Sequence, residues 1–300
     1  MQTYQVSHDT RQALLGEYAN LDVTHDMEHQ SVTFSMNVQP RPCFTWDLVR
    51  DILSFQAMVR TACHELDIRY LVYASSSKDA FSFGGDLHMF RELIRARDAV
   101  QLKSYAMDCA TILYNNSISL GCPITTISLI QGDALGGGFE AALSSNVVIA
   151  ERGAKLGFPE IMFNLVPGHG AFNLIARRIG PSAATRIILN GRLYPAEELH
   201  RMGLIDILVE DGEGQRAVTT YIRRQNKAWN GYRAMQRIQG TYIPLTLQEL
   251  QASAEIWVEA ALQVGPTHLR VMDRLIRAQN RAVMGQINEK PALSVVSSMS

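Results

Sequence analysis

Runs of apolar residues with the spacing of strands, separated by longer segments with helical spacing, recur over the first 210 residues. After a polar leader with a short helix at 1–20, the pattern predicts strands at 30–38, 69–77, 124–132, 146–152 and 205–210. It predicts helices at 46–63, from Asp86 to about Asn116, and at 137–144, with Asp86 as the N-cap of the second. Strands that alternate with helices in this way indicate one layered α/β unit.

Beyond residue 212 the pattern is helical throughout. In the segment LTLQELQASAEIWVEAAL the apolar residues fall on one helical stripe, formed by Leu247, Leu250, Ala254, Trp257, Val258 and Ala261. No linker rich in proline, glycine or serine separates this part from the rest. We therefore expect residues 1–212 to form an α/β core with the catalytic site, and residues 213–300 to form a helical lid or an oligomer contact.

Composition and charge narrow the class of protein. A chain of 300 residues with 47% hydrophobic and 19% charged residues is ordinary for a soluble globular enzyme. A net charge of −1 argues against a nucleic-acid partner, and no apolar run approaches the roughly 20 residues that span a bilayer. The N-terminal stretch lacks the layout of a secretory signal, and the four cysteines show neither a CxxC pair nor metal-ligand spacing. These features predict a cytoplasmic protein with reduced thiols and no metal site.

Three consecutive glycines, Gly136 to Gly138, stand between a predicted buried strand and a predicted helix. A glycine turn at this place lets a ligand approach the unpaired N–H groups of the helix N-terminus, and a phosphate, a carboxylate or an oxyanion would suit them. The stretch has neither the GK[ST] of a phosphate-binding loop nor GxGxxG spacing. A second pair, Gly84 and Gly85, also precedes a helix. One N–H from each loop would form an oxyanion hole, in which each donor contributes about 3–4 kcal/mol to transition-state stabilisation.

Two glutamates stand beside unusual neighbours. Glu140 directly follows the glycine turn, and Glu160 lies in the apolar context LGFPEIMF. Burial raises the pKa of a carboxyl group toward values useful for acid–base work, so that one acid accepts a proton while the other delivers one. Each also has a structural alternative, in which Glu140 caps a helix start and Glu160 pairs with an arginine.

The segments AFSFGGDL, ISLIQGDALGGGFEAALSSNVVIAERGAKLGFPE and LVPGHGAFNLIARRIG resemble the crotonase (enoyl-CoA hydratase/isomerase) superfamily, over about residues 30–212. The resemblance implies a crotonase-like spiral of ββα units with a C-terminal helical region that builds homotrimers, often paired into hexamers. It places the oxyanion-hole donors on Gly85 and Gly137, and it matches the two hydratase glutamates to Glu140 and Glu160. No cofactor is implied.

Several departures point to a particular subfamily. The segment CFTWDLV follows the RP at 41–42, at a place where hydratases usually carry an Asn-Ala-Leu element. Asn146 stands where true hydratases commonly have an aspartate, and His169 interrupts the PGxG turn. The segment after FGGDL and the LVPGHG block are most similar to bacterial diffusible-signal-factor synthases. That resemblance implies dehydration of a 3-hydroxyacyl-acyl-carrier-protein, followed by thioester hydrolysis that releases a cis-2-enoic fatty acid used in quorum sensing. The split of roles favoured here makes Glu160 the base and Glu140 the acid.

Each of the weaker signals has two interpretations. Trp257 and Gly168 are candidates for lining the acyl site, with core packing as the alternative for Trp257. His169 either shapes its loop or takes part in the chemistry. Arg91 and Arg95, with Arg97 and Lys103 nearby, form either a solvated face or a landing patch for an acidic carrier protein. Two other functions also stay open: an ordinary 2-trans-enoyl-CoA hydratase acting on coenzyme A esters, and a non-catalytic regulator that binds a signalling protein.

Overall fold

A six-stranded sheet forms the centre of the molecule. The computed structural model describes residues 2–77 and 80–288. The order of strands is β1 (Leu21–Asp26), β2 (Ser31–Met36), β3 (Tyr70–Ser75), β5 (Thr125–Ile130), β7 (Val147–Glu151) and β10 (Ile207–Val209). β1 and β2 form an antiparallel pair, and all later neighbours are parallel. The strands expected from the sequence are confirmed, while β1 was not predicted.

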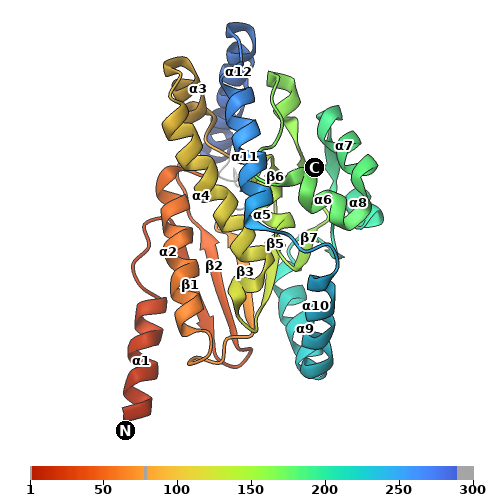
Figure 1. Ribbon diagram of the computed structural model, residues 1–300. Coiled ribbons are helices and arrows are strands. Elements are labelled where there is room, and N and C mark those ends of the chain that lie inside the picture. The colour runs from red at the N-terminus through yellow and green to blue at the C-terminus, as the bar shows by residue number, and fades with distance from the viewer. Residues whose placement is uncertain (1, 78–79, 289–300) are drawn as a thin grey trace, which may run out of the picture.

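Helices cover both faces of this sheet, as Figure 1 shows. The side chains of β3 alternate between the two faces, as a strand requires. Leu71 and Tyr73 join the main core beneath α2 (Trp46–Ala62) and α4 (Ala99–Ser117). Tyr70 and Val72 pack on the opposite side against α9 (Gly214–Asn226). Coverage on both faces explains why β5 is buried at every position and reads as an unbroken apolar run.

A second sheet of four short strands lies beside the first. It contains β4 (Ala80–Ser82), β6 (Asp133–Leu135), β8 (Lys155–Gly157) and β9 (Leu193–Pro195). Each of β4, β6 and β8 follows a strand of the large sheet and precedes a helical segment, so the chain winds through repeated ββα units. The crotonase-like spiral expected from the resemblance is therefore confirmed. Strands of three residues are too short to carry a periodic signal, which is why none of them was predicted.

The helix expected from Asp86 to about Asn116 is in fact two helices, α3 (Leu87–Ala96) and α4. Asp86 caps α3 as predicted, because its carboxylate accepts the N–H of His88. Arg97 then adopts a left-handed conformation, with a φ of 53°, and Asp98 caps α4 by accepting the N–H of Gln101. A left-handed residue followed by a fresh N-cap ends one helix and begins another. The uninterrupted apolar spacing of the sequence hides this break.

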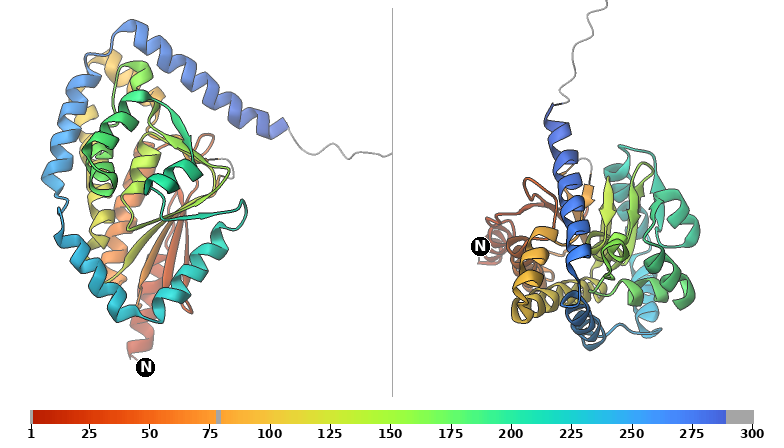
Figure 2. Two further views of the ribbon diagram at one scale, coloured as in Figure 1. Left: turned by 90° about the vertical axis from the view of Figure 1, so that its right-hand side faces the viewer. Right: turned by 90° about the horizontal axis from the view of Figure 1, so that it is seen from above.

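The remaining helices connect strands or lie along the outside of the molecule. They are α1 (Gln2–Leu14), η1 (Ser119–Gly121), α5 (Gly137–Leu143), η2 (Pro159–Phe163), α6 (Ala171–Ile179), α7 (Pro181–Asn190), α8 (Ala196–Met202), α10 (Trp229–Thr241), α11 (Leu247–Ala261) and α12 (Pro266–Asn288). α11 lies along α4, and its predicted apolar stripe is buried except for the partly exposed Leu247. α12 crosses the end of the molecule opposite α9 and α10 and contacts α3 and η2 (Figure 2). No helix within residues 2–77 and 80–288 is long and apolar enough to cross a bilayer.

Candidate active site

The three consecutive glycines are required for three different reasons. Gly136 has a φ of 52° at the N-cap of α5, and a Cβ there would overlap the carboxyl group of Glu160. A Cβ on Gly138 would lie 2.5 Å from the carbonyl oxygen of Ser82, so this glycine lets α5 approach β4. Gly137 is different, because a Cβ there would meet only ordinary contacts, the nearest being the Gly85 nitrogen at 3.5 Å. Its bare Cα therefore keeps open the space in front of that nitrogen.

The second glycine loop faces the first. Gly84 has a φ of 87°, its N–H donates to Ser82 Oγ at 3.1 Å, and its carbonyl accepts the N–H of Phe44 at 2.8 Å. The CFTWDLV segment thus holds this loop in place. Within the described residues, neither the Gly85 N–H nor the Gly137 N–H donates a backbone hydrogen bond. Two unpaired donors converge on one small space, as an oxyanion hole requires.

Glu140 is almost completely buried, with 1% of its surface exposed. Its Oε1 accepts the backbone N–H groups of His169 and Ala171, both at 2.9 Å. Its Oε2 lies 3.3 Å from the imidazole Nδ1 of His169. Glu140 therefore caps a helix start, as the structural alternative held, but the helix is α6 rather than its own. These N–H donors at the N-terminus of α6 hold the Glu140 carboxyl group in a fixed position.

Glu160 has the opposite environment. Its Oε2 is buried without a hydrogen-bond partner in the described part of the chain, and no arginine there pairs with it. Burial, together with the negative charge of Glu140, raises the pKa of Glu160 to about 8. The two acids thus differ in their surroundings: Glu140 accepts two backbone N–H groups, whereas Oε2 of Glu160 has no such partner and the pKa of Glu160 is raised.

All the predicted site residues line one cavity with a volume of about 260 Å³. Glu140 and Glu160 share it with the glycines of both loops, and Gly168 and Trp257 stand on its wall in direct contact, since a Cβ on Gly168 would overlap the indole ring. The other lining side chains are largely apolar. Three come from α12, which was expected only as a general lid: Leu275, Ala278 and Gln279.

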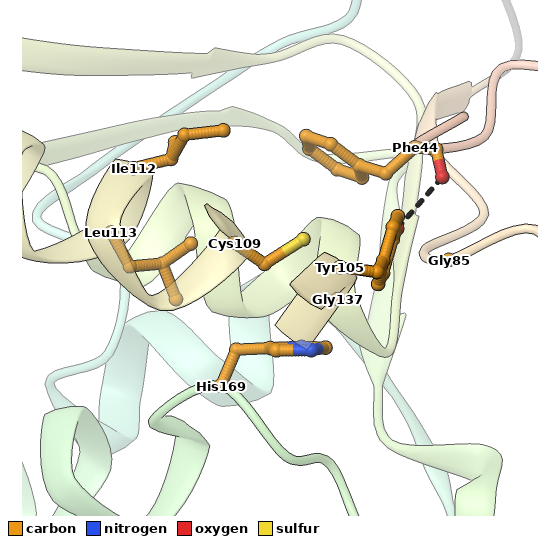
Figure 3. A pocket seen from close by; sticks show the side chains of 8 residues that line it. All are labelled: Phe44, Gly85, Tyr105, Cys109, Ile112, Leu113, Gly137 and His169. Atoms are coloured by element: carbon orange, nitrogen blue, oxygen red, sulfur yellow. Dashed lines mark hydrogen bonds between the residues drawn. The ribbon is translucent and has the colours of Figure 1, made fainter. Parts of the chain in front are cut away.

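A second, smaller pocket of about 20 Å³ adjoins the glycines and shares Gly85, Gly137 and His169 with the main cavity (Figure 3). Its other walls are Phe44, Tyr105, Cys109, Ile112 and Leu113. The Tyr105 hydroxyl donates to the Phe44 carbonyl at 2.7 Å and so reinforces the loop contact. Sequence reasoning missed these α4 residues, because an apolar helical stripe looks the same whether it faces a core or a pocket.

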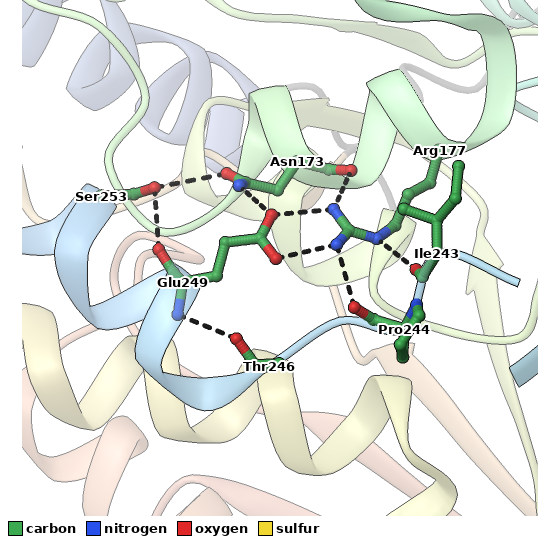
Figure 4. A network of polar contacts seen from close by, with 7 residues as sticks. All are labelled: Asn173, Arg177, Ile243, Pro244, Thr246, Glu249 and Ser253. Atoms are coloured by element: carbon green, nitrogen blue, oxygen red, sulfur yellow. Dashed lines mark hydrogen bonds and ion pairs between the residues drawn. The ribbon is translucent and has the colours of Figure 1, made fainter. Parts of the chain in front are cut away.

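A polar network joins α6 to the C-terminal helices (Figure 4). The Arg177 guanidinium donates to both carboxylate oxygens of Glu249, at 2.9 and 2.8 Å, and to the carbonyls of Ile243 and Pro244. Glu249 lies in the first turn of α11, the helix that carries Trp257, whereas Arg177 lies on α6, whose N-terminus binds Glu140. Bidentate pairing of this kind fixes orientation as well as distance. The network therefore fixes the cavity wall relative to the catalytic candidate.

Four other residues singled out in the sequence lie outside the cavity lining and are already paired. Asn146 accepts the N–H of Thr126 at 2.8 Å and secures the start of β5. Arg91 and Arg95 both pair with Asp273 of α12, and Lys103 pairs with Glu255 of α11. These cations hold helices together, which favours the solvated-face interpretation over a landing patch. No group of metal-binding side chains occurs among the described residues.

Comparison with known proteins identifies the family. A sequence model of the enoyl-CoA hydratase/isomerase family matches residues 54–287. The peroxisomal fatty acid beta-oxidation multifunctional protein AIM1 of Arabidopsis thaliana is 30% identical over 154 residues, which are 51% of this chain and only 20% of that protein. The match thus spans about a fifth of that relative's length.

Solved structures share the fold. An enoyl-CoA hydratase from Bacillus halodurans superimposes with a TM-score of 0.74 at 21% identity, covering 86% of this chain and 100% of the other. DspI from Pseudomonas aeruginosa superimposes with a TM-score of 0.62 at 24% identity, covering 88% of this chain and 96% of the other. The family match over most of the sequence and the shared spiral show that the chain belongs to the enoyl-CoA hydratase/isomerase family, within the crotonase superfamily of enzymes.

Proposed function

We propose that the protein dehydrates a 3-hydroxyacyl thioester carried by acyl carrier protein to the cis-2-enoyl thioester and then hydrolyses it, releasing a free fatty-acid signal. The observation that carries the proposal is the arrangement of two carboxyl groups and two unpaired N–H donors around one largely apolar cavity. The resemblance of the LVPGHGAFNLIARRIG block to signal-factor synthases supports the choice of substrate and product. The trimer that this family resemblance implies is part of the proposal.

Dehydration uses the two acids as a pair. The Gly85 and Gly137 N–H groups bind the thioester oxygen, and a carboxylate removes the proton from C2, which leaves an enolate on that oxygen. The C3–O bond then breaks as the other carboxyl group protonates the departing hydroxyl, so that water leaves. We assign the base to Glu160 and the acid to Glu140, so the reactive form is the one in which Glu160 has lost its proton and Glu140 carries one; a carboxylate whose pKa is about 8 is a stronger base than an ordinary glutamate.

Thioester hydrolysis follows from the protonation state that dehydration leaves. Glu160 then carries the proton taken from C2, and Glu140 has given its proton to the departing water. Glu140 can take a proton from a water molecule as that water attacks the thioester carbon. The same two N–H groups stabilise the tetrahedral oxyanion, and when it collapses the C–S bond breaks and the carrier thiolate takes the proton held by Glu160, which restores the starting protonation states.

The test supplies one acyl chain on two carriers. Purified protein is incubated with 3-hydroxyoctanoyl-acyl-carrier-protein, with 3-hydroxyoctanoyl-CoA and with trans-2-octenoyl-CoA, and mass spectrometry follows free acids and thioesters. We expect free cis-2-octenoic acid from the carrier-protein substrate. Glu140→Ala and Glu160→Ala should abolish it, whereas Glu259→Ala on the exposed face of α11 should not. Reversible hydration of the coenzyme A ester without free acid would favour the ordinary hydratase, and no turnover at all would favour the binding regulator.

A further inference from the structure

His169 contacts both carboxylate oxygens of Glu140. Its backbone N–H donates to Oε1 at 2.9 Å, and its imidazole Nδ1 lies 3.3 Å from Oε2. The residue is buried, in the turn between η2 and α6, and its ring contacts Trp257 and Tyr105 with centroid separations of 5.5 and 6.2 Å. Packing against two large rings fixes the imidazole plane, so the contact with Oε2 is a property of the fold rather than of a mobile side chain.

The contacts described so far give no partner to the other imidazole nitrogen of His169. Nε2 of His169 is buried and has no hydrogen-bond partner in the described part of the chain. The ring lines both the main cavity and the small pocket, and Figure 3 shows it below Tyr105 and Gly137. Tyr105 is not available to it, because its hydroxyl already donates to the Phe44 carbonyl. A buried polar atom without a partner is costly, so one that faces a ligand cavity calls for a partner from the ligand.

The titratable groups around the ring determine its tautomer. Glu140 on α5, Glu160 on η2, and Tyr105 and Cys109 on α4 face this part of the cavity. Burial keeps Tyr105 and Cys109 neutral by raising the pKa of both side chains far above the physiological range. The acceptor nearest to the ring is therefore the Oε2 of Glu140, and a proton on Nδ1 satisfies it. With that proton in place, Nε2 carries a lone pair and can only accept.

We propose that His169 is a positioning residue: its Nδ1–H holds the Glu140 carboxyl group at Oε2, and its Nε2 accepts a hydrogen bond from the 3-hydroxyl group of the bound acyl thioester. The inference rests on the proposed function for the identity of that hydroxyl. The inference gives the site a preference for hydroxylated over saturated acyl chains. The imidazole of His169 recognises the hydroxyl group and also orients Glu140. In the dehydrated complex, the same lone pair can hold the water that attacks the thioester.

Three substitutions separate the two roles. Asparagine places an amide nitrogen near the position of Nδ1 but has no atom at Nε2, glutamine reaches the Nε2 position but not Nδ1, and methionine fills the volume without either group. We expect His169→Met and His169→Gln to lower kcat by roughly tenfold to a hundredfold, because the buried Oε2 of Glu140 is left without the hydrogen bond that positions it. His169→Asn should stay within a few-fold of the wild-type kcat. The matched control is His88→Asn, since His88 is exposed on α3.

Binding gives the second readout. Dissociation constants are measured for 3-hydroxyoctanoyl- and octanoyl-acyl-carrier-protein, with octanoyl as the chain lacking the hydroxyl. The wild type should prefer the hydroxylated chain by roughly tenfold, and His169→Asn and His169→Met should lose that preference. If His169→Met keeps the wild-type kcat, or if His169→Asn keeps the preference, the proposal is wrong.

The tautomer can be measured without turnover. In full-length protein labelled with ¹⁵N-histidine, long-range ¹⁵N–¹H spectra should show His169 protonated on Nδ1 and unprotonated on Nε2, with its signals identified by their loss in His169→Asn. A ring protonated on Nε2 at pH 7 would overturn the proposal. Because this result needs no substrate, it separates failure of the His169 assignment from failure of the proposed function, which would show instead as a wild-type protein that releases no free acid.

Discussion

Replacing Glu160 with glutamine should make the protein inactive but more stable at alkaline pH. The reason is the burial of its Oε2 without a partner next to Glu140, which raises the pKa of Glu160 to about 8. In the unfolded chain the same carboxyl group titrates near its ordinary value of 4.5. Between these two pH values the folded protein keeps a proton that the unfolded chain has lost. Stability must therefore fall as the pH rises through that window.

The size of the effect follows from proton linkage. One retained proton changes the free energy of unfolding by roughly 1.4 kcal/mol per pH unit, so the wild type should lose roughly 3 kcal/mol between pH 5.5 and pH 8 through this group alone. That is a substantial part of the 5–15 kcal/mol typical of a folded domain. Glutamine resembles the protonated acid in shape and does not titrate, so Glu160→Gln should lack this loss.

Urea unfolding at a fixed protein concentration measures the unfolding free energy of both proteins at several pH values from 5.5 to 8.5. The quantity to follow is the difference in unfolding free energy between Glu160→Gln and the wild type, since other titrating groups affect both proteins alike. We expect this difference to grow steadily up to about pH 8 and then level off. Glu259→Gln, at an exposed position on α11, should show no such trend. Parallel curves for Glu160→Gln and the wild type across the whole range would refute the assignment of a buried, protonated Glu160.

Three further predictions concern the cavity and the assembly. Gly137→Ala should fold normally, because its Cβ has room, but its turnover should fall by roughly 10²–10³-fold because that Cβ blocks the Gly85 N–H. The control Gly231→Ala on α10 should leave the rate intact, and an active Gly137→Ala would argue against the oxyanion hole. Trp257→Ala should destabilise the protein by about 3–5 kcal/mol in urea unfolding and admit bulkier acyl chains; unchanged chain selectivity would remove it from the acyl wall. Light scattering should show a trimer or a multiple of three, because α10 has no buried residue and leaves Met235 and Ile238 largely exposed; a monomer at micromolar concentration would contradict the assembly.

The sequence allowed the large sheet and the two acids to be predicted because each has a local signal. β5 is a continuous apolar run because helices cover both of its faces. Glu160 has apolar neighbours on both sides in the sequence, and the structure places its carboxyl group where those neighbours led us to expect it. The small sheet had no such signal. Its strands have three residues each, and the pairing that defines them joins segments about twenty or more residues apart.

The interpretation of Glu140 shows why single-residue alternatives were hard to decide from sequence. Its helix-capping role was weighed against catalysis as though only one could hold. In the structure the capped helix is α6, some thirty residues further along the chain, and the capping N–H groups hold the carboxyl group at the wall of the cavity. The hydrogen bonds that cap α6 therefore also position the carboxyl group proposed for catalysis. No pattern within a short window contains that contact.

The repeated topology explains how residues so far apart in sequence reach one cavity. β4, β6 and β8 are parallel neighbours, and parallel strands bring their carboxyl ends to the same edge of a sheet. The loop after β4 contains Gly85, α5 after β6 begins at Gly137, and η2 after β8 contains Glu160. Each of the three ββα units thus places a candidate site residue just after its short strand. Glu140 lies in the first turn of α5, the helix that β6 leads into. The distance between the two acids therefore depends on the spacing of adjacent strands. A change within one repeat cannot alter that spacing without breaking the sheet.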